Sequence, residues 1–178
     1  ATLGRPTEIV VDLYAGIGYF TLPFLVKAGV AEVHACEWNP HAAHALRRNL
    51  ELNGVAARCT VLEGDNVETA PRDVADRVSL GLIPTSGRGW AGGCAARRPD
   101  KGGWLHIHDN VEVPKGEDQE TAFTRRAREM ESTLVELNQA ARGQIWAARC
   151  NHVERVKSYA PRVFHVVMDI EFRPQEGD

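Results

Sequence analysis

The sequence lacks any apolar stretch long enough to cross a membrane, and neither a signal peptide nor a low-complexity tract is visible in these 178 residues. It also lacks a basic surplus, because 21 lysines and arginines stand against 24 aspartates and glutamates, a formal net charge of -3. Domains that bind nucleic acid usually carry such a surplus, so an RNA substrate would have to find most of its phosphate contacts elsewhere. What remains is a globular chain of 178 residues, long enough to bury a core as a single domain.

Cysteine is scarce and its spacing is uninformative. The four cysteines are Cys36, Cys59, Cys94 and Cys150. They lack both the paired spacing of a zinc site and the density of a disulfide scaffold. We therefore expect reduced, structural thiols, no bound metal, and a cytoplasmic location.

A turn with two glycines follows the first apolar run. Residues 9–12 end in Asp12, and Gly16 and Gly18 follow, which predicts a buried strand and a tight turn into a helix. The dinucleotide fingerprint requires a third glycine where Thr21 stands, and a carboxylate at the mouth of the turn repels a diphosphate. S-adenosylmethionine carries a sulfonium and an ammonium, so its charges match this turn. The alternative is a close crossing of helix and strand without a ligand.

Two further polar positions follow predicted strands. Glu37 comes after an expected strand over residues 32–36, about twenty residues beyond the glycine turn, where a carboxylate can accept hydrogen bonds from ribose hydroxyls. Asp65 and Asn66 follow the next strand, and either could accept the adenine amino group, although such a pair is also an ordinary turn former. Because ligands of doubly wound sheets lie outside the carboxyl ends of the strands, we expect these acids and Asp12 to converge on one crevice.

The rest of the chain alternates between strand and helix patterns. Strands are expected over residues 9–12, 32–36, 59–62, 74–83, 104–108, 153–159 and 164–172, and helices over 21–28, 40–53 and 123–137. Residues 87–103, rich in glycine and arginine, are expected to form a loop with a poorly formed helix. The last two strands, joined by a short turn, predict an antiparallel hairpin at one end of a mostly parallel sheet. The pattern predicts an α/β, Rossmann-like three-layer sandwich of the class I S-adenosylmethionine-dependent methyltransferase type.

Five segments carry a more specific resemblance. They are residues 12–23, 36–42, 49–54, 64–66 and 155–161. They resemble the catalytic domain of the wybutosine-synthesising aminocarboxypropyl transferases, which are relatives of the tRNA guanine-37 N1-methyltransferases. The methyltransferase relatives carry an Asn-Leu-Pro motif at the end of the fourth strand, whereas this chain has Gly81 and no such asparagine. It therefore resembles the aminocarboxypropyl branch.

The resemblance implies an activity and a set of site residues. The 3-amino-3-carboxypropyl group of S-adenosylmethionine would go to carbon 7 of 4-demethylwyosine at position 37 of phenylalanine tRNA, in the anticodon loop, with loss of methylthioadenosine. The residues expected to bind the cofactor are Asp12, Tyr14, Ala15, Gly16, Gly18, Phe20, Glu37, Trp38, Asp65, Asn66 and Gly81. Residues 1–178 would be a single catalytic domain without the family's amino-terminal tRNA-binding region.

A base must take the proton from carbon 7. His106, His108 and Asp109 at the end of the fifth strand are candidates by position, and water is the alternative. Alternation puts the two histidines on one side of that strand. Three other functions stay open. They are methyl transfer to guanine 37, binding of the cofactor or a protein without chemistry, and a nicotinamide oxidoreductase, which the missing glycine disfavours.

Overall fold

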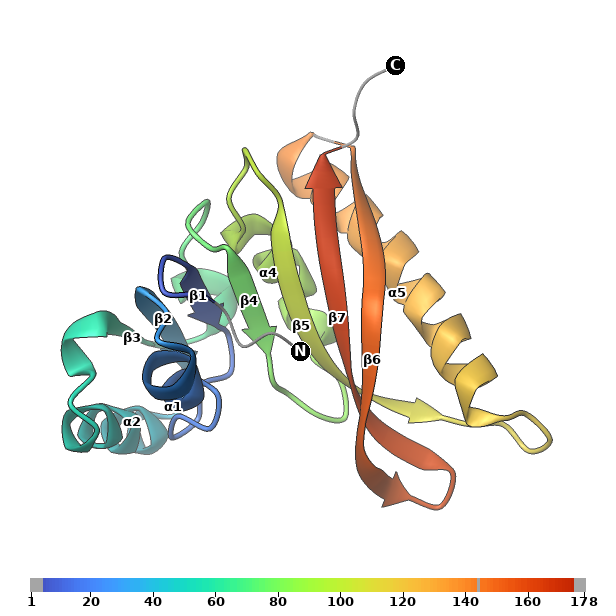
Figure 1. The fold of residues 1–178 in the computed structure, drawn as a ribbon, viewed down its shortest axis with the longest axis horizontal. Coiled ribbons are helices and arrows are strands. Elements are labelled where there is room, and N and C mark those ends of the chain that lie inside the picture. The colour runs from blue at the N-terminus through green and yellow to red at the C-terminus, as the bar shows by residue number, and fades with distance from the viewer. Residues whose placement is uncertain (1–4, 144, 175–178) are drawn as a thin grey trace.

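The computed structural model describes residues 5–143 and 145–174 (Figure 1). The strands are β1 (Ile9–Asp12), β2 (Glu32–Glu37), β3 (Cys59–Glu63), β4 (Arg77–Leu80), β5 (Gly103–Glu112), β6 (Trp146–Ala160) and β7 (Val163–Pro174). The helices are α1 (Thr21–Pro23), a π-helical turn η1 (Phe24–Ala28), α2 (Pro40–Leu52), α3 (Asn66–Thr69), α4 (Trp90–Ala96) and α5 (Gln119–Arg142). Two short 3-10 turns, η2 (Ala56–Arg58) and η3 (Gly87–Gly89), complete the elements.

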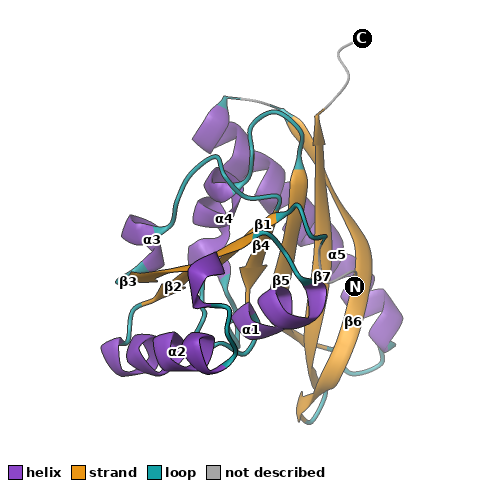
Figure 2. Cartoon of the chain, turned by 60° about the vertical axis from the view of Figure 1, so that its left-hand side comes forward, coloured by secondary structure: helices purple, strands orange, loops and turns teal. Residues whose placement is uncertain are grey.

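All seven strands form one sheet in the order β3-β2-β1-β4-β5-β7-β6. The strands from β1 to β5 pair in parallel, and β7 is antiparallel to both β5 and β6. Helices α1 and α2 lie on one face of the sheet and α4 and α5 on the other (Figure 2). The predicted three-layer fold and its antiparallel hairpin are therefore confirmed. No helix of the described residues is long and apolar enough to span a membrane.

Side-chain alternation along the strands divides the core into two clusters. In β1, Val10 packs with Leu46 and other residues beneath α1 and α2. Its neighbour Val11 joins a separate cluster with Leu105 and Met130 beneath α4 and α5. Both faces of the central strands are thus buried, which explains why these strands read as continuous apolar runs.

Several element boundaries differ from the predicted ones for identifiable reasons. Helix α5 is longer than the stripe over 123–137, because Asp118 accepts a hydrogen bond from the Thr121 N–H at its start and Gly143 ends it in the left-handed conformation. The segment expected to be mostly irregular contains η3 and α4. Strand β6 begins at Trp146 rather than at residue 153, since pairing with β7 extends it.

Candidate functional site

The glycine turn is held against the end of β2 by one carboxylate. The Gly16 N–H donates to Glu37 Oε2 and the Asn39 N–H donates to Oε1, each at 2.8 Å. Gly16 has a φ of 56°, a conformation that glycine adopts without strain. Glu37 is only 8 % exposed. A carboxylate offers about four acceptor positions, so Glu37 keeps two for the hydroxyls of a ligand.

A cavity of about 500 Å³ lies at the carboxyl ends of β1, β2 and β3. It is lined by Leu13, Tyr14, Cys36, Glu37, Trp38, Gly64, Asp65, Asn66, Leu82 and Arg88. Its size falls in the range of small-molecule sites. Five of the predicted cofactor-binding residues line it, namely Tyr14, Glu37, Trp38, Asp65 and Asn66. The structure thus brings Glu37 and Asp65 to one cavity, whereas Asp12, which was expected with them, does not line it.

The hydrogen bonds of Asp65 and Asn66 distinguish their roles. Asp65 caps α3 by accepting from the Val67 N–H at 3.0 Å, and it also accepts from Arg88 Nη2 at 2.6 Å. Asn66 donates its amide N–H to the Leu13 carbonyl at 2.8 Å, which leaves its amide oxygen as an acceptor. Sequence reasoning did not find Arg88 as a lining residue, because its partner is 23 positions away along the chain.

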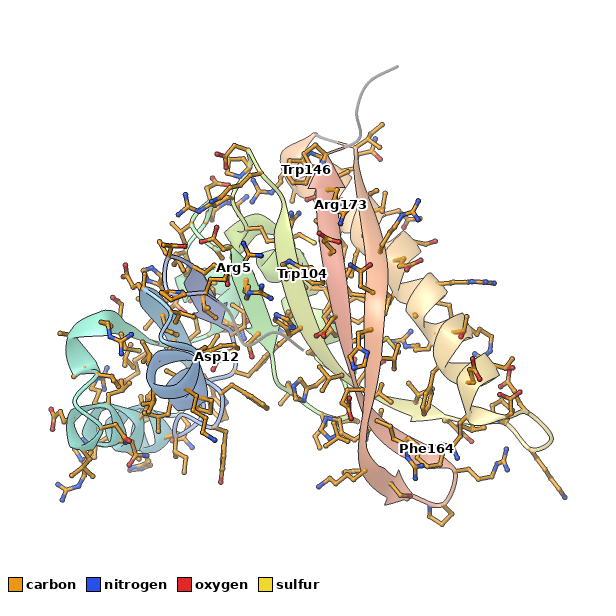
Figure 3. All side chains as sticks on the ribbon, in the orientation of Figure 1. Arg5, Asp12, Trp104, Trp146, Phe164 and Arg173 are labelled. Atoms are coloured by element: carbon orange, nitrogen blue, oxygen red, sulfur yellow. The ribbon has the colours of Figure 1, made fainter. Side chains whose placement is uncertain are left out.

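Asp12 was expected at the mouth of the turn, but it is fully buried and does not line the cavity. Figure 3 shows it at the end of β1. The Thr21 hydroxyl donates to Asp12 Oδ2 at 2.8 Å. Burial raises the pKa of Asp12 to about 6, although the bond from Thr21 partly opposes this. Because Asp12 is buried, its carboxylate cannot contact a ligand in the cavity, and its charge can act on such a ligand only through the protein that lies between them.

The remaining predicted cofactor residues pack around the turn rather than line this cavity. A Cβ on Gly18 would lie 3.0 Å from Leu46 Cδ1, so Gly18 permits close packing against α2. A Cβ on Gly81 would lie 2.8 Å from Phe20 Cε2, so the Phe20 ring occupies the space that a side chain would need. Ala15 is buried, and its N–H donates to the Cys36 carbonyl.

A second cavity, of about 300 Å³, lies on the same side of the sheet as α1. It is lined by Phe20, Phe24, Ser79, His106, His108, Glu154, Val156, His165, Val167 and Asp169. The register of the sheet places Asp12, Ser79, His106 and Asp169 in one row across β1, β4, β5 and β7. This row forms a polar stripe on the α1 side of the sheet.

Both ring nitrogens of His106 are engaged within this stripe. His106 Nδ1 lies 2.6 Å from Asp169 Oδ1, and Nε2 lies 3.3 Å from Arg77 Nη1. A guanidinium can only donate, so Nε2 is the acceptor and Nδ1 carries the proton that Asp169 accepts. Arg77 is itself bonded to Glu8 at 2.7 Å. His106 therefore has no basic lone pair left over while this network is intact.

His108 and Asp109 lie on opposite faces of β5. His108 Nδ1 lies 2.9 Å from His165 Nε2, and burial lowers the pKa of His108 to about 4, so the ring is neutral at neutral pH. Asp109 is buried on the α5 side and accepts from Arg126 Nε at 2.7 Å. The two histidines share one side of the strand as predicted, but Asp109 is not part of their cluster.

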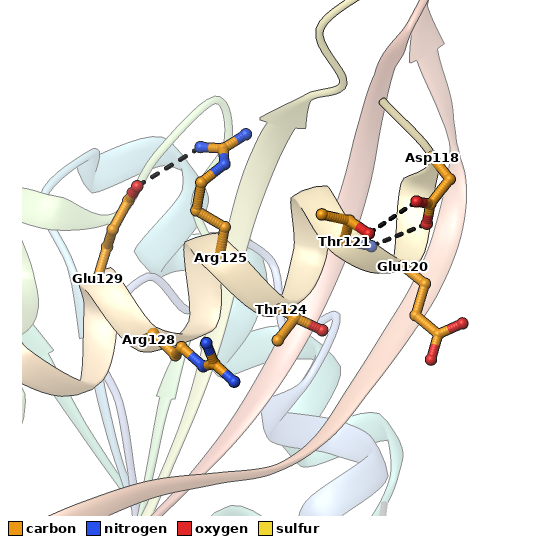
Figure 4. A pocket seen from close by; sticks show the side chains of 7 residues that line it. All are labelled: Asp118, Glu120, Thr121, Thr124, Arg125, Arg128 and Glu129. Carbon is orange, nitrogen blue, oxygen red and sulfur yellow. Dashed lines mark hydrogen bonds and ion pairs between the residues drawn. The ribbon is translucent and has the colours of Figure 1, made fainter. Parts of the chain in front are cut away.

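A hollow of about 800 Å³ forms a shallow groove along the first turns of α5 (Figure 4). Asp118 caps the helix there, and Arg125 pairs with Glu117 and Glu129. Arg125 is therefore already paired, and the groove lies on an open surface. Across the described residues, no cluster of three or more His, Cys, Asp or Glu side chains is arranged to hold a metal ion.

Comparison with known proteins gives a consistent family. The family model described as the TRM5/TYW2 methyltransferase domain matches residues 1–136. A mouse (Mus musculus) tRNA wybutosine-synthesizing protein 2 homolog is 44% identical over 214 residues, covering 98% of this chain and 48% of that protein. This chain thus spans about half the length of the wybutosine-synthesizing protein 2 homologs that it matches.

Two solved structures are also similar. M. jannaschii TYW2 in complex with AdoMet superimposes with a TM-score of 0.82 at 29% identity, covering 96% of this chain and 71% of that one. P. horikoshii TYW2 in complex with MeSAdo gives 0.79 at 27% identity, covering 96% and 58%. The predicted resemblance is confirmed by sequence and by structure. The chain belongs to the TRM5/TYW2 methyltransferase domain family.

Proposed function

We propose that this domain binds S-adenosylmethionine in the cavity beside Glu37 and, within its full-length protein, transfers the 3-amino-3-carboxypropyl group to a modified guanine of tRNA. The acceptor would be carbon 7 of 4-demethylwyosine at position 37, in the anticodon loop of phenylalanine tRNA, and the reaction would take place in the cytoplasm. The observation that carries the proposal is the Glu37 carboxylate, fixed at the end of β2 with acceptor positions to spare. The names of the similar proteins support the reaction assigned to it.

The lining residues fit the proposed cofactor. Glu37 can accept from both ribose hydroxyls, and the amide oxygen of Asn66 can accept from the adenine amino group. Trp38 is 74 % exposed at the rim and offers a ring on which adenine can stack. Asp12, when ionised, favours a cationic ligand nearby. Together these groups recognise a positively charged adenosine derivative.

S-adenosylmethionine, when bound, would supply a methionine γ-carbon activated by the sulfonium. This carbon would bond to carbon 7, and the carbon–sulfur bond would break with its electron pair going to sulfur. The residues of this chain hold the reacting atoms in line, which can supply much of the rate gain. The proton of carbon 7 leaves to a base. We assign this role to His108 rather than His106 or Asp109, because His108 is neutral and its partners do not include a carboxylate or a guanidinium.

Product analysis on the full-length protein tests the proposal. The protein is incubated with S-adenosylmethionine and phenylalanine tRNA bearing 4-demethylwyosine, and the nucleoside and the leaving group are identified by mass spectrometry. We expect methylthioadenosine and an aminocarboxypropylated base. The family description joins two branches, so tRNA with unmodified guanine 37 is run in parallel. If the products are S-adenosylhomocysteine and a methylated base, the protein is a methyltransferase and the proposed reaction is wrong. If the folded protein shows no heat of S-adenosylmethionine binding in calorimetry, a non-catalytic role is indicated instead.

A further inference from the structure

The end of β6 and its turn into β7 concentrate positive charge in an acidic chain. Residues 155–162 read Arg-Val-Lys-Ser-Tyr-Ala-Pro-Arg, with three cations and no acidic residue, whereas the whole chain has a net charge of -3. We call these eight residues the basic hairpin. All of them are exposed except Ala160, which is half-buried. Neither cavity accounts for this run of charge.

The register of the sheet places the basic hairpin toward the edge at which the parallel strands end. Ala160 pairs with Val163, and Val163 pairs with Glu112, the last residue of β5. Because β5 runs parallel to β4 and β1, its end lies at the same edge of the sheet as the glycine turn. Figure 3 shows Phe164 near the turn between β6 and β7, at the opposite end of the hairpin from Trp146. Val156 of the hairpin also lines the second cavity.

The cations of the basic hairpin are not neutralised by acids. The Arg155 guanidinium lies over the Phe164 ring, 4.7 Å from its centroid, and Arg162 donates to the carbonyls of Val113 and Pro114. Neither these two side chains nor Lys157 forms an ion pair with a carboxylate in the described part of the chain. The net positive charge is therefore available to an external anion.

The same segment exposes an aromatic ring between its cations. Tyr159 is 54 % exposed, and its neighbours in sequence are small or polar. Alternating cations and exposed aromatic rings favour single-stranded RNA, because cations attract phosphates and a ring stacks on any unpaired base. An acidic protein partner would pair with the cations of the hairpin but would offer no base on which Tyr159 could stack.

We propose that the basic hairpin is the surface on which this domain contacts the RNA, with Lys157 and its neighbouring arginines facing the phosphates and Tyr159 stacking on an unpaired base. The inference rests on the proposed function and adds to it the place where the substrate docks. A loop bound there lies next to the second cavity, so one of its bases can be splayed toward Phe20 and His108.

The test uses the full-length protein carrying Lys157→Glu, with Arg149→Glu as the matched control. Both positions are exposed cations on β6, but Arg149 lies toward the opposite end of the strand. Binding of a phenylalanine tRNA anticodon stem-loop is measured by fluorescence anisotropy over a series of salt concentrations, and S-adenosylmethionine binding by calorimetry. We expect Lys157→Glu to weaken RNA binding by about tenfold or more and to reduce the salt slope by about one. Cofactor affinity and Arg149→Glu should stay close to wild type.

A second pair of variants tests the ring. Tyr159→Phe should retain RNA affinity, while Tyr159→Leu should lose roughly five- to tenfold, since stacking on a base is worth at least about 1 kcal/mol. Unchanged RNA binding by Lys157→Glu, equal losses in Lys157→Glu and Arg149→Glu, or no RNA binding by the wild type would overturn the proposal. Wild-type RNA binding that depends on Lys157, without any aminocarboxypropyl product, would instead contradict only the proposed reaction.

Discussion

The ring of Phe20 lies against the bare Cα of Gly81, so that a methyl group at Gly81 would stand 2.8 Å from Phe20 Cε2. The Phe20 ring also contacts His108: the two ring centroids lie 4.9 Å apart in an edge-to-face arrangement. Gly81 follows β4 directly, next to Leu82 of the first cavity. One aromatic ring thus couples the end of β4 to the histidines of the second cavity.

Substitution of Gly81 by alanine should displace Phe20 and disturb His108. We expect turnover of full-length protein to fall by about tenfold or more, since a misplacement of about 1 Å in an active site can cost more than that. Gly92→Ala in α4 is the matched control, because a Cβ there meets no atom within 4 Å. It should keep activity and gain roughly 0.5–1 kcal/mol in the free energy of unfolding. Wild-type turnover by Gly81→Ala would contradict the coupling.

Glu37→Gln should weaken S-adenosylmethionine binding. A glutamine amide has one acceptor oxygen, so it cannot accept from both the Gly16 and Asn39 N–H groups and also from ribose hydroxyls. We expect a loss of roughly 10- to 100-fold in affinity, the range for hydrogen bonds to a charged group. Calorimetry measures this. Glu63→Gln, at the paired position of β3, is the control and should bind normally; if both variants bind equally well, Glu37 does not hold the cofactor.

Asp12→Asn should change the pH dependence of stability. The pKa of Asp12 is raised from 3.8 to about 6 in the folded state, so the folded protein holds the extra proton between these values and stability falls as pH rises from about 4 to 6. The buried charge costs about 3 kcal/mol above pH 6. The variant should therefore gain stability relative to wild type across this window, as measured by urea unfolding. A constant difference between pH 4 and 7 would contradict the burial of this charge.

His108→Gln should change the pH dependence of stability in the opposite direction. Burial and the neighbouring His165 lower the pKa of His108 from 6.5 to about 4, so the unfolded chain takes up a proton first as the solution is acidified. Wild-type stability should fall by about 3 kcal/mol between pH 6.5 and 4 from this group. The variant should lose that part of the slope in urea unfolding. His44→Gln, an exposed position on α2, should leave the slope unchanged.

The sequence by itself determined most of the strands and the longer helices, together with half of the residues that line the first cavity. The glycine turn, the acid at the end of β2 and the Asp65-Asn66 pair were predictable, because each depends on a local pattern and on the rule that parallel strands end at one edge. Their contacts confirm the grouping of Glu37, Asp65 and Asn66 around one cavity. The hairpin at the end of the sheet was likewise evident from alternation and a short turn.

Only the tertiary structure decided which side chains meet across the sheet. Strand β7 lies between β5 and β6, and this order places Asp169 beside His106, 63 residues away in sequence. The same packing buries Asp12 below the turn and brings Arg88 to Asp65. Alternation along a strand fixes the face on which a side chain stands, but its partners depend on strand order and register. These are settled by burial of the two cores, a property of the whole chain rather than of any local segment.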